Sequence, residues 1–319
     1  MTENIITGGV MVNYGEAVTQ VRKKFMFDHE TFARILNISA QKLRRIEANE
    51  VKIDFWQFTD IMERGGVMYD NYWYYQVNSK EKKDYDAVQN IKRLVYRSRF
   101  EEVVKAIDEL VKNGLPENPY MSQFITWAKV TTDSTLSNEE AIAKLEAALS
   151  MTKPNFDLEH PWTQHYNLNE ISLIGRIAAK TFYLGGNNQK KAIAIMEMLL
   201  ESREVNETAW ETKATLYPPM MYTLASFYGQ IKDSHTALDK CNKGKKISQV
   251  YDNMRYIPMF TYLQARILLD MLPEGEKVNS EIHYLVNEAY FSARAMGEDA
   301  FAELVKNNAE EYFGIVLSS

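Results

Sequence analysis

Helix-opening residues recur along this 319-residue chain at an almost constant spacing. Each of them opens the second helix of a candidate helix pair or lies in the turn before it. The four positions are Asn138, Asn187, Asp233 and Asn279, and successive members are 49, 46 and 46 residues apart. Such a period predicts stacked helical hairpins, each of which buries its apolar face against its neighbour. A standard tetratricopeptide repeat has about 34 residues, so we expect irregular repeats of that general kind. The alternative is an irregular helical domain without true repeats.

Apolar residues after position 86 keep a helical spacing to the end of the chain. Representative groups are Val103, Ile107 and Leu110; Ile142, Leu145 and Leu149; and Ile193, Met196 and Leu199. The chain has only 8 prolines and 14 glycines, and no convincing run of alternating strand residues occurs. We therefore predict an all-α fold.

The segment from Asp28 to Glu47 predicts two short helices joined by a tight turn. Asp28 can cap the first helix and Ser39 the second. Between them, Asn37 tolerates the left-handed conformation that a tight turn needs. Ile38 and Leu43 stand at the positions of a hydrophobic staple around the second cap. This pattern predicts a helix-turn-helix.

The second of these helices has one apolar and one basic face. Leu43 and Ile46 point toward the core, since successive residues turn by about 100°. Gln41, Arg44 and Arg45 share the opposite face. Arginine can pair with guanine and glutamine with adenine in the major groove. The pattern is typical of a DNA recognition helix, with phosphate contacts expected from Arg34, Lys42 and the cap amides.

Residues Gly15–Met62 resemble the Cro/repressor-type (xenobiotic-response-element) helix-turn-helix. The matching positions are Arg22, Phe32, Ala33, Leu36, Ile38, Ser39, Ile46 and Glu47. The resemblance implies that Arg22 and Glu47 form a structural ion pair. Two positions depart from the pattern: His29 replaces the usual glutamine, and Ala48-Asn49 replaces the usual Asn-Gly. The predicted DNA-binding residues are His29, Arg34, Ser39, Ala40, Gln41, Lys42, Arg44 and Arg45.

Charge counts predict that one copy of this motif binds DNA weakly. The whole chain has a net charge of −6, and residues 13–64 carry nine Lys or Arg against eight Asp or Glu. Non-specific affinity grows with the number of phosphates neutralised. We therefore expect a homodimer on a palindromic or pseudo-palindromic double-stranded site.

An N-terminal helix-turn-helix followed by irregular tetratricopeptide-like repeats resembles the layout of the RRNPP regulators, Gram-positive quorum-sensing receptors for short intracellular peptide pheromones. Arg44–Phe55 is similar to the Rgg/MutR branch, and the PrgX-type receptors are a second possibility. The resemblance implies a five-helix DNA-binding domain, a right-handed superhelical repeat array and a cytoplasmic transcription regulator. The expected parts are a flexible arm (1–13), the helix-turn-helix domain (14–68), a linker or helix (69–86), and a repeat domain for peptide binding and dimerisation (87–319).

An extended peptide needs polar partners for its amides and apolar pockets for its side chains. The candidate peptide-binding residues are Asn169, Arg176, Tyr183, Tyr222, Phe227, Arg255, Tyr256 and Tyr262. Arg176 lies in an apolar run, so a buried ion pair is an equal alternative to a ligand contact. The tyrosines and Phe227 have core packing as their alternative. Two other functions stay open: repeats that dock a protein partner, and a scaffold without DNA binding.

Catalysis, cofactors and membrane insertion find no support in the sequence. His160 and His165 lack metalloprotease spacing, and the lone Cys241 has no second thiol for a zinc site. We expect Cys241 to be a buried, small apolar residue. No window of about 18 apolar residues occurs. The N-terminus does not resemble a signal peptide, which favours the cytoplasm.

Overall fold

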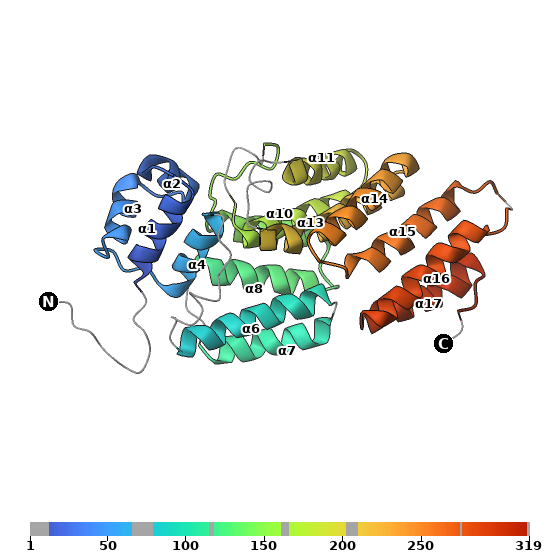
Figure 1. The fold of residues 1–319 in the computed structure, drawn as a ribbon, viewed down its shortest axis with the longest axis horizontal. Coiled ribbons are helices and arrows are strands. Elements are labelled where there is room, and N and C mark those ends of the chain that lie inside the picture. Colours follow the sequence, from blue (N-terminus) through green and yellow to red (C-terminus); the bar gives the residue numbers. More distant parts are fainter. Residues whose placement is uncertain are drawn as a thin grey trace. The chain divides into compact units, whose positions relative to one another are not determined.

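The computed structural model describes residues 13–65, 79–97, 99–114, 118–160, 166–201, 210–274 and 276–317. Every regular element within these ranges is an α-helix (Figure 1). The predicted all-α class is therefore confirmed. Most of the predicted arm, residues 1–12, lies outside the described residues, as do residues 66–78 with the aromatic-rich start of the predicted linker.

The N-terminal part, residues 13–65, contains four of the five predicted short helices. Their core holds Phe32, Leu43 and Phe58, whose side chains are fully buried. α1 packs against α3 and α4, and α2 packs against α3. Helices this short are marginal alone and depend on that packing. They are α1 (Tyr14–Lys24), α2 (His29–Ile35), α3 (Ala40–Glu47) and α4 (Phe55–Arg64).

The later helices form consecutive packed pairs. α6 packs against α7, α8 against α9, α13 against α14, and α15 against α16, which also packs against α17. The ranges are α6 (Ser79–Tyr96), α7 (Phe100–Lys112), α8 (Pro119–Thr132), α9 (Asn138–Ser150), α10 (Leu168–Phe182), α11 (Asn187–Glu201), α13 (Trp210–Gln230), α14 (Ser234–Val250), α15 (Tyr256–Met271), α16 (Ser280–Ala295) and α17 (Asp299–Phe313).

All four predicted helix-opening positions are confirmed. Asn138 and Asn187 are the first residues of α9 and α11. Asp233 and Asn279 cap α14 and α16, because their side chains accept hydrogen bonds from backbone N–H groups in the first turn. Their capping side chains therefore fix where α14 and α16 begin.

The described chain divides into two compact units within α10. The first unit runs to Lys180, and the second comprises Thr181–Glu201 and the residues from Trp210 onward. In the first unit, α4 packs against α8. The four N-terminal helices and the first hairpins therefore belong to one compact body.

Pro218 and Pro219 lie inside the long helix α13 of the second unit. Pro218 has no N–H, so it cannot donate to the carbonyl of Ala214 one turn earlier. The side-chain amide of Asn253 donates to that carbonyl oxygen instead, at 2.7 Å. A side chain from the α14–α15 turn thus replaces the hydrogen bond that the proline removes.

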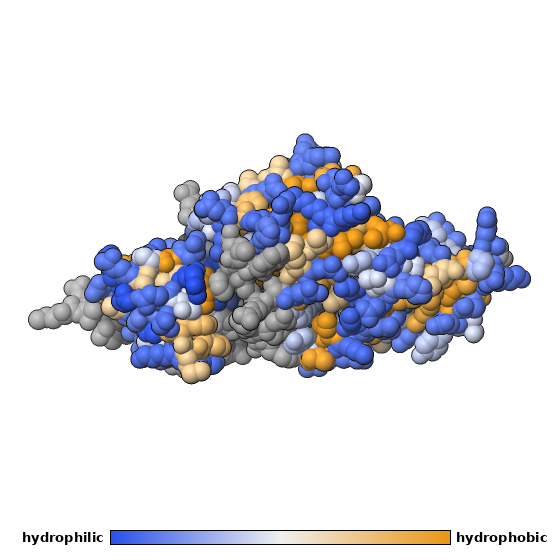
Figure 2. Space-filling view, turned by 90° about the horizontal axis from the view of Figure 1, so that it is seen from above, coloured by the Kyte–Doolittle hydropathy of each residue, from blue (hydrophilic) through white to orange (hydrophobic). Residues whose placement is uncertain are grey.

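Within the described residues, no helix has both the length and the apolar character needed to cross a membrane. The face in Figure 2 is mainly hydrophilic, with separate hydrophobic areas. Exposed apolar side chains on α16 and α17 include Tyr284, Phe291, Leu304 and Tyr312.

The close approach of α14 to α15 gives a stability prediction. A Cβ added at Gly244 would lie 2.1 Å from the Phe260 ring. Gly244→Ala should therefore lower the free energy of unfolding by about 1–3 kcal/mol, the usual cost of overpacking. Chemical denaturation monitored by circular dichroism measures the change.

Gly229→Ala is the matched control, because its added Cβ would lie 3.5 Å from Ile267, an ordinary contact. It should leave stability unchanged or raise it, since alanine favours helix over glycine. A Gly244→Ala protein as stable as the wild type would contradict the packing described for this pair of helices.

Candidate nucleic-acid interface and ligand-site residues

Caps and turns define the helix-turn-helix as the sequence predicted. Asp28 accepts a hydrogen bond from the Thr31 backbone N–H at 2.7 Å. Ser39 Oγ accepts one from the Lys42 backbone N–H at 3.1 Å. Asn37 has a φ of 56°, the left-handed conformation expected for the turn. Each helix therefore begins where its own capping side chain fixes it.

Helix α3 presents a polar face to solvent and an apolar face to the core. Leu43 and Ile46 are buried, and they hold the orientation of the helix. The remaining predicted DNA contacts surround the exposed face. Arg34, Ser39, Gln41, Lys42, Arg44 and Arg45 are exposed, while His29 and Ala40 are half-buried.

Both arginines of the exposed face have acidic neighbours that the sequence analysis missed. Arg44 Nη2 lies 2.6 Å from Glu30 Oε1, and Arg45 Nε lies 3.7 Å from Glu50 Oε2. All four side chains are more than half exposed. Exposed pairs contribute about 0–1 kcal/mol, so a phosphate or a base edge can replace these partners at low cost.

Arg22 and Glu47 form the ion pair that the resemblance implied. Arg22 Nε and Nη2 donate to the two carboxylate oxygens of Glu47 at 2.6 and 3.0 Å. His29 Nε2 also lies 3.1 Å from Glu47. Burial alone would raise the pKa of Glu47, but the hydrogen bonds and charge of Arg22, with a smaller effect of His29, lower it below its ordinary value. His29 therefore has a structural partner in addition to its predicted DNA contact.

Gly15 lets α1 approach the end of α3. A Cβ at this position would lie 2.4 Å from the carbonyl oxygen of Ile46. The Gly15 backbone N–H donates to Asn49 Oδ1 at 3.2 Å, and Asn49 Nδ2 donates to Asn13 Oδ1 at 2.8 Å. Asn49 has a φ of 58°. The departure from Asn-Gly is therefore accommodated, and Asn49 also ties α3 to the start of α1.

The first unit contains two of the candidate peptide-binding residues, Asn169 and Arg176, both on α10. Asn169 Nδ2 donates to Gln123 Oε1 at 3.3 Å, and the residue lines a pocket described below. Arg176 is partly buried and has an interaction partner of its own.

In the second unit, two candidate tyrosines, Tyr183 and Tyr262, lie near a third, Tyr222. Burial raises the pKa of Tyr222 to about 12, with smaller effects of Cys241, Tyr262 and Tyr183. Tyr262 is buried, and its hydroxyl has no hydrogen-bond partner among the described residues. Tyr183 is 58% exposed. A buried hydroxyl without a partner is costly, and here it belongs to a group of tyrosines that reaches the surface.

The other three candidates of this unit already have structural contacts. Phe227 is buried and stacks on Phe182, with ring centroids 4.0 Å apart. Tyr256 is buried in the same cluster as Phe260. Arg255 Nε forms an ion pair with Glu298 at 3.0 Å. Core packing, the alternative weighed for these aromatic residues, accounts for the positions of Phe227 and Tyr256.

Cys241 is fully buried, as predicted. Burial raises the pKa of its thiol to about 12, which leaves it unreactive. Within the described ranges, no group of three or more His, Cys, Asp and Glu side chains is placed to hold a metal ion.

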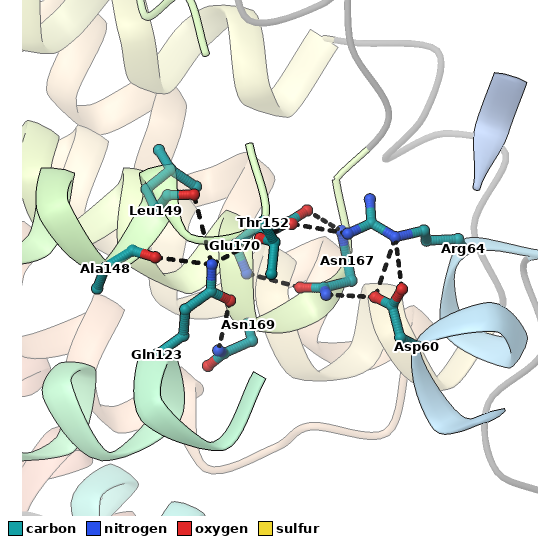
Figure 3. A network of polar contacts seen from close by, with 9 residues as sticks. All are labelled: Asp60, Arg64, Gln123, Ala148, Leu149, Thr152, Asn167, Asn169 and Glu170. Atoms are coloured by element: carbon teal, nitrogen blue, oxygen red, sulfur yellow. Dashed lines mark hydrogen bonds and ion pairs between the residues drawn. The ribbon is translucent and has the colours of Figure 1, made fainter. Parts of the chain in front are cut away.

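A buried polar network, which the sequence analysis did not predict, connects α4 to α10 (Figure 3). Arg64 Nε donates to Asp60 at 2.9 Å, and Arg64 Nη2 donates to Glu170 at 2.7 Å. Burial opposes the charge of Arg64, but the two carboxylates outweigh it and raise its pKa. Asn167 Nδ2 donates to Asp60, and Thr152 donates to Glu170. The network therefore fixes α4 on the first hairpins.

No protein-family profile and no curated protein matches the sequence. Solved structures match its fold. Bacillus thuringiensis PlcR, in complex with the peptide PapR7 and DNA, has a TM-score of 0.59 at 16% identity, over 92% of this chain and 99% of that chain. Its apo form has a TM-score of 0.53 at 17% identity, over 92% and 98%. ComR from S. thermophilus, in complex with DNA and its signalling peptide ComS, has a TM-score of 0.52 at 15% identity, over 95% and 100%. At these identities the likeness establishes a shared fold.

The Arg22–Glu47 pair predicts a pH-dependent contribution to stability. Glu47→Gln should lower the free energy of unfolding at neutral pH by about 1.5–3 kcal/mol, the range for hydrogen bonds to charged groups. Because the folded-state pKa of Glu47 is lowered, its contribution is present above the unfolded pKa and is lost as the pH falls through the folded value. The difference between the two proteins should therefore shrink below about pH 4.5, the ordinary value for glutamate. Urea denaturation at several pH values measures it.

Glu50→Gln is the matched control, because Glu50 is exposed and lies farther from its arginine. It should change stability by less than about 0.5 kcal/mol. Equal effects of the two substitutions would argue against a structural role for Glu47.

Proposed function

We propose that this chain, which shares the fold of PlcR and ComR, is a cytoplasmic DNA-binding transcription regulator controlled by a short signalling peptide. The matched PlcR structure is a complex with the peptide PapR7 and DNA, and the matched ComR structure is a complex with DNA and its signalling peptide ComS. The single observation that carries the proposal is the exposed face of α3, where Gln41, Arg44 and Arg45 stand opposite a fully packed core. The predicted DNA contacts lie on and around this face.

The helix-turn-helix contains a structural arginine and two exposed arginines, and this difference supports DNA binding. Arg22 is held by the partly buried Glu47 and serves the scaffold. Arg44 and Arg45 are exposed and held only by exposed acids. Arginines of the second kind can exchange their partner for a base edge or a phosphate, which is what a recognition helix requires.

We propose that the protein acts as a homodimer on a palindromic or pseudo-palindromic site. The support is the near-neutral charge of residues 13–64, which makes a single copy a weak binder. Two copies would double the number of phosphate contacts. Exposed aromatic side chains at Tyr284 and Phe291, seven residues apart on one face of α16, offer apolar area for association.

The tyrosine group of the second unit supports peptide binding. Tyr262 keeps a buried hydroxyl without a partner among the described residues, and Tyr222 lies near both Tyr262 and Tyr183. A peptide backbone offers both donors and acceptors, so it can satisfy such a hydroxyl while its side chains pack on the rings. We propose Tyr183, Tyr222 and Tyr262 as the primary peptide contacts, with Arg255 of the same unit as a further contact that would have to exchange its present partner, Glu298.

The alternative is a DNA-binding regulator whose repeats dock a folded protein partner. The exposed apolar side chains of α16 and α17 favour it. The two functions differ in their ligand: a short peptide alone stabilises a peptide receptor, whereas a docking surface needs the folded partner.

DNA binding is tested on the recognition face. The double variant Arg44→Ala/Arg45→Ala should lose sequence-selective binding to duplexes selected from a random pool, while its melting temperature stays within a few degrees of the wild type, since both residues are exposed. Fluorescence anisotropy at several salt concentrations measures the binding. Persistence of selective binding in the double variant would show that α3 is not the recognition helix.

Glu30→Gln is the matched variant, and its expected effect on DNA binding is the opposite of that of the double variant. It removes the acid that holds Arg44, so it should strengthen binding to non-selected duplexes.

Peptide binding is tested at the hydroxyl of Tyr262. Tyr262→Phe should raise the stability of the free protein by about 1–3 kcal/mol, because it removes an unsatisfied buried polar group. The same substitution should weaken the thermal shift produced by a cognate peptide found in a screen of short peptides.

Tyr284→Phe is the control: it keeps the ring proposed for association and removes only a hydroxyl from a side chain that is 65% exposed, so it should change neither quantity. A stability gain with unchanged peptide affinity would mean that the hydroxyl of Tyr262 does not contact the peptide. If no short peptide shifts the melting temperature, the receptor function fails.

A further inference from the structure

A pocket in the first unit lies where α4 of the helix-turn-helix meets α6, α8 and α10. Its cavity volume is about 50 Å³, and it opens to solvent. Its aromatic walls are Trp56, Tyr85, Tyr120 and Phe124. Its polar groups include Asp60, Glu63, Lys92 and Asn169. None of the contacts proposed above for DNA uses this pocket.

The charged groups at this pocket do not balance. Asp60 and Glu170 share the single charge of Arg64. Glu63 adds a third carboxylate, and Lys92 acts on it as the second cation. Asp60, Glu63 and Lys92 line the pocket, whereas Glu170 does not line it but is tied to Asp60 through Arg64. Among the described residues, three carboxylates therefore stand in and beside the pocket with two cations. Burying an unbalanced charge is expensive, so a site of this kind holds a proton or takes up another cation.

The excess negative charge changes the pKa of the Glu63 carboxyl. Burial raises the pKa of its carboxyl, Lys92 lowers it, and the neighbouring Asp60 raises it again; Arg64 and a hydrogen bond with the Leu168 backbone lower it. The net result is a raised pKa. A cation placed beside this carboxyl would replace the proton and restore the ionised form.

The walls of the pocket suit a cation that carries an apolar body. The Trp56 and Tyr85 rings stack with centroids 6.5 Å apart. Lys92 Nζ already lies 5.8 Å from the centre of the Phe124 ring, which shows that an ammonium group is compatible with these faces. Asn169 uses its amide nitrogen for Gln123, so its carbonyl oxygen remains an acceptor beside the pocket.

We propose that this pocket binds a small organic primary amine with an aromatic or aliphatic body. Its ammonium group pairs with the Glu63 carboxylate, and its body packs against Trp56 and Tyr85. An ammonium is favoured over a neutral or anionic ligand because the site carries one carboxylate more than its cations balance. The amine is an effector distinct from the signalling peptide.

Occupation of the pocket ties two parts of the first unit together. Trp56, Asp60 and Glu63 belong to α4, which follows the recognition helix, whereas Tyr85 and Asn169 belong to α6 and α10. A ligand that contacts both sides stabilises their association in addition to the Arg64 network. The amine therefore reinforces the attachment of the helix-turn-helix to the first hairpins.

The test is isothermal titration of the full-length protein with three probes of similar size: 2-phenylethylamine, 2-phenylethanol and phenylacetate. The amine should bind with an affinity in roughly the millimolar range or tighter, as its few heavy atoms allow. The alcohol and the acid should bind at least about tenfold more weakly, since they lack the charge. Equal affinities for amine and alcohol, or no binding of the amine, would overturn the proposal.

Variants locate the site. Glu63→Gln should weaken amine binding by about tenfold or more and make amine and alcohol nearly equal. Glu102→Gln, on an exposed carboxylate of α7, should leave amine binding unchanged. Trp56→Ala should weaken amine and alcohol alike, because it removes a wall. A melting curve of each variant establishes that it is folded, and a folded Glu63→Gln protein with wild-type amine affinity would refute the site.

A second measurement distinguishes ion pairing from packing. Near the raised pKa of Glu63, amine binding should release a proton from the protein, which appears as a dependence of the binding heat on the ionisation enthalpy of the buffer. Glu63→Gln should abolish that dependence. Unchanged proton release in the variant would place the amine elsewhere. Failure of DNA or peptide binding would leave these outcomes unaffected, because none of the readouts involves either ligand.

Discussion

Arg64 lies where two carboxylates from distant parts of the chain meet, with Asp60 one turn before it on α4 and Glu170 on α10. Its side chain is only 2% exposed, so its permanent positive charge needs both acids to compensate it. Removing one partner of a buried ion pair leaves an uncompensated charge, which costs several kcal/mol. The position of the helix-turn-helix on the first hairpins therefore depends on this single cation, as does the charge imbalance of the neighbouring pocket.

The charged side chains of the helix-turn-helix fall into a shielded group and an exposed group. Arg22 and Glu47 are largely shielded from solvent and hold α1 to α3. Arg44 and Arg45 are exposed, and their acidic neighbours are exposed too. An exposed pair is weak because water screens it. The same residue type thus serves the scaffold in one environment and stays available for DNA in the other.

Burial also separates the candidate residues of the second unit. Phe227 lies in the core against Phe182, and its apolar ring is fully satisfied there. Tyr262 is buried to a similar degree, but its hydroxyl lacks a partner. Sequence spacing placed both on helix faces of the same kind, and could not tell them apart, because hydrogen bonding to a buried hydroxyl depends on which helices surround it.

The sequence by itself determined what depends on neighbours along the chain. Four side chains cap helices, because a cap bonds to N–H groups two or three residues away: Asp28, Ser39, Asp233 and Asn279. The apolar and polar faces of α3 likewise follow from the spacing of its residues, since successive residues of a helix turn by about 100°. Only the tertiary structure decided which charges meet. Arg64 and Glu170 are 106 residues apart, so no local pattern pairs them. The Glu30–Arg44 pair, the pocket beneath α4 and the unsatisfied hydroxyl of Tyr262 likewise arise from packing, since each requires side chains that only the folded chain brings together.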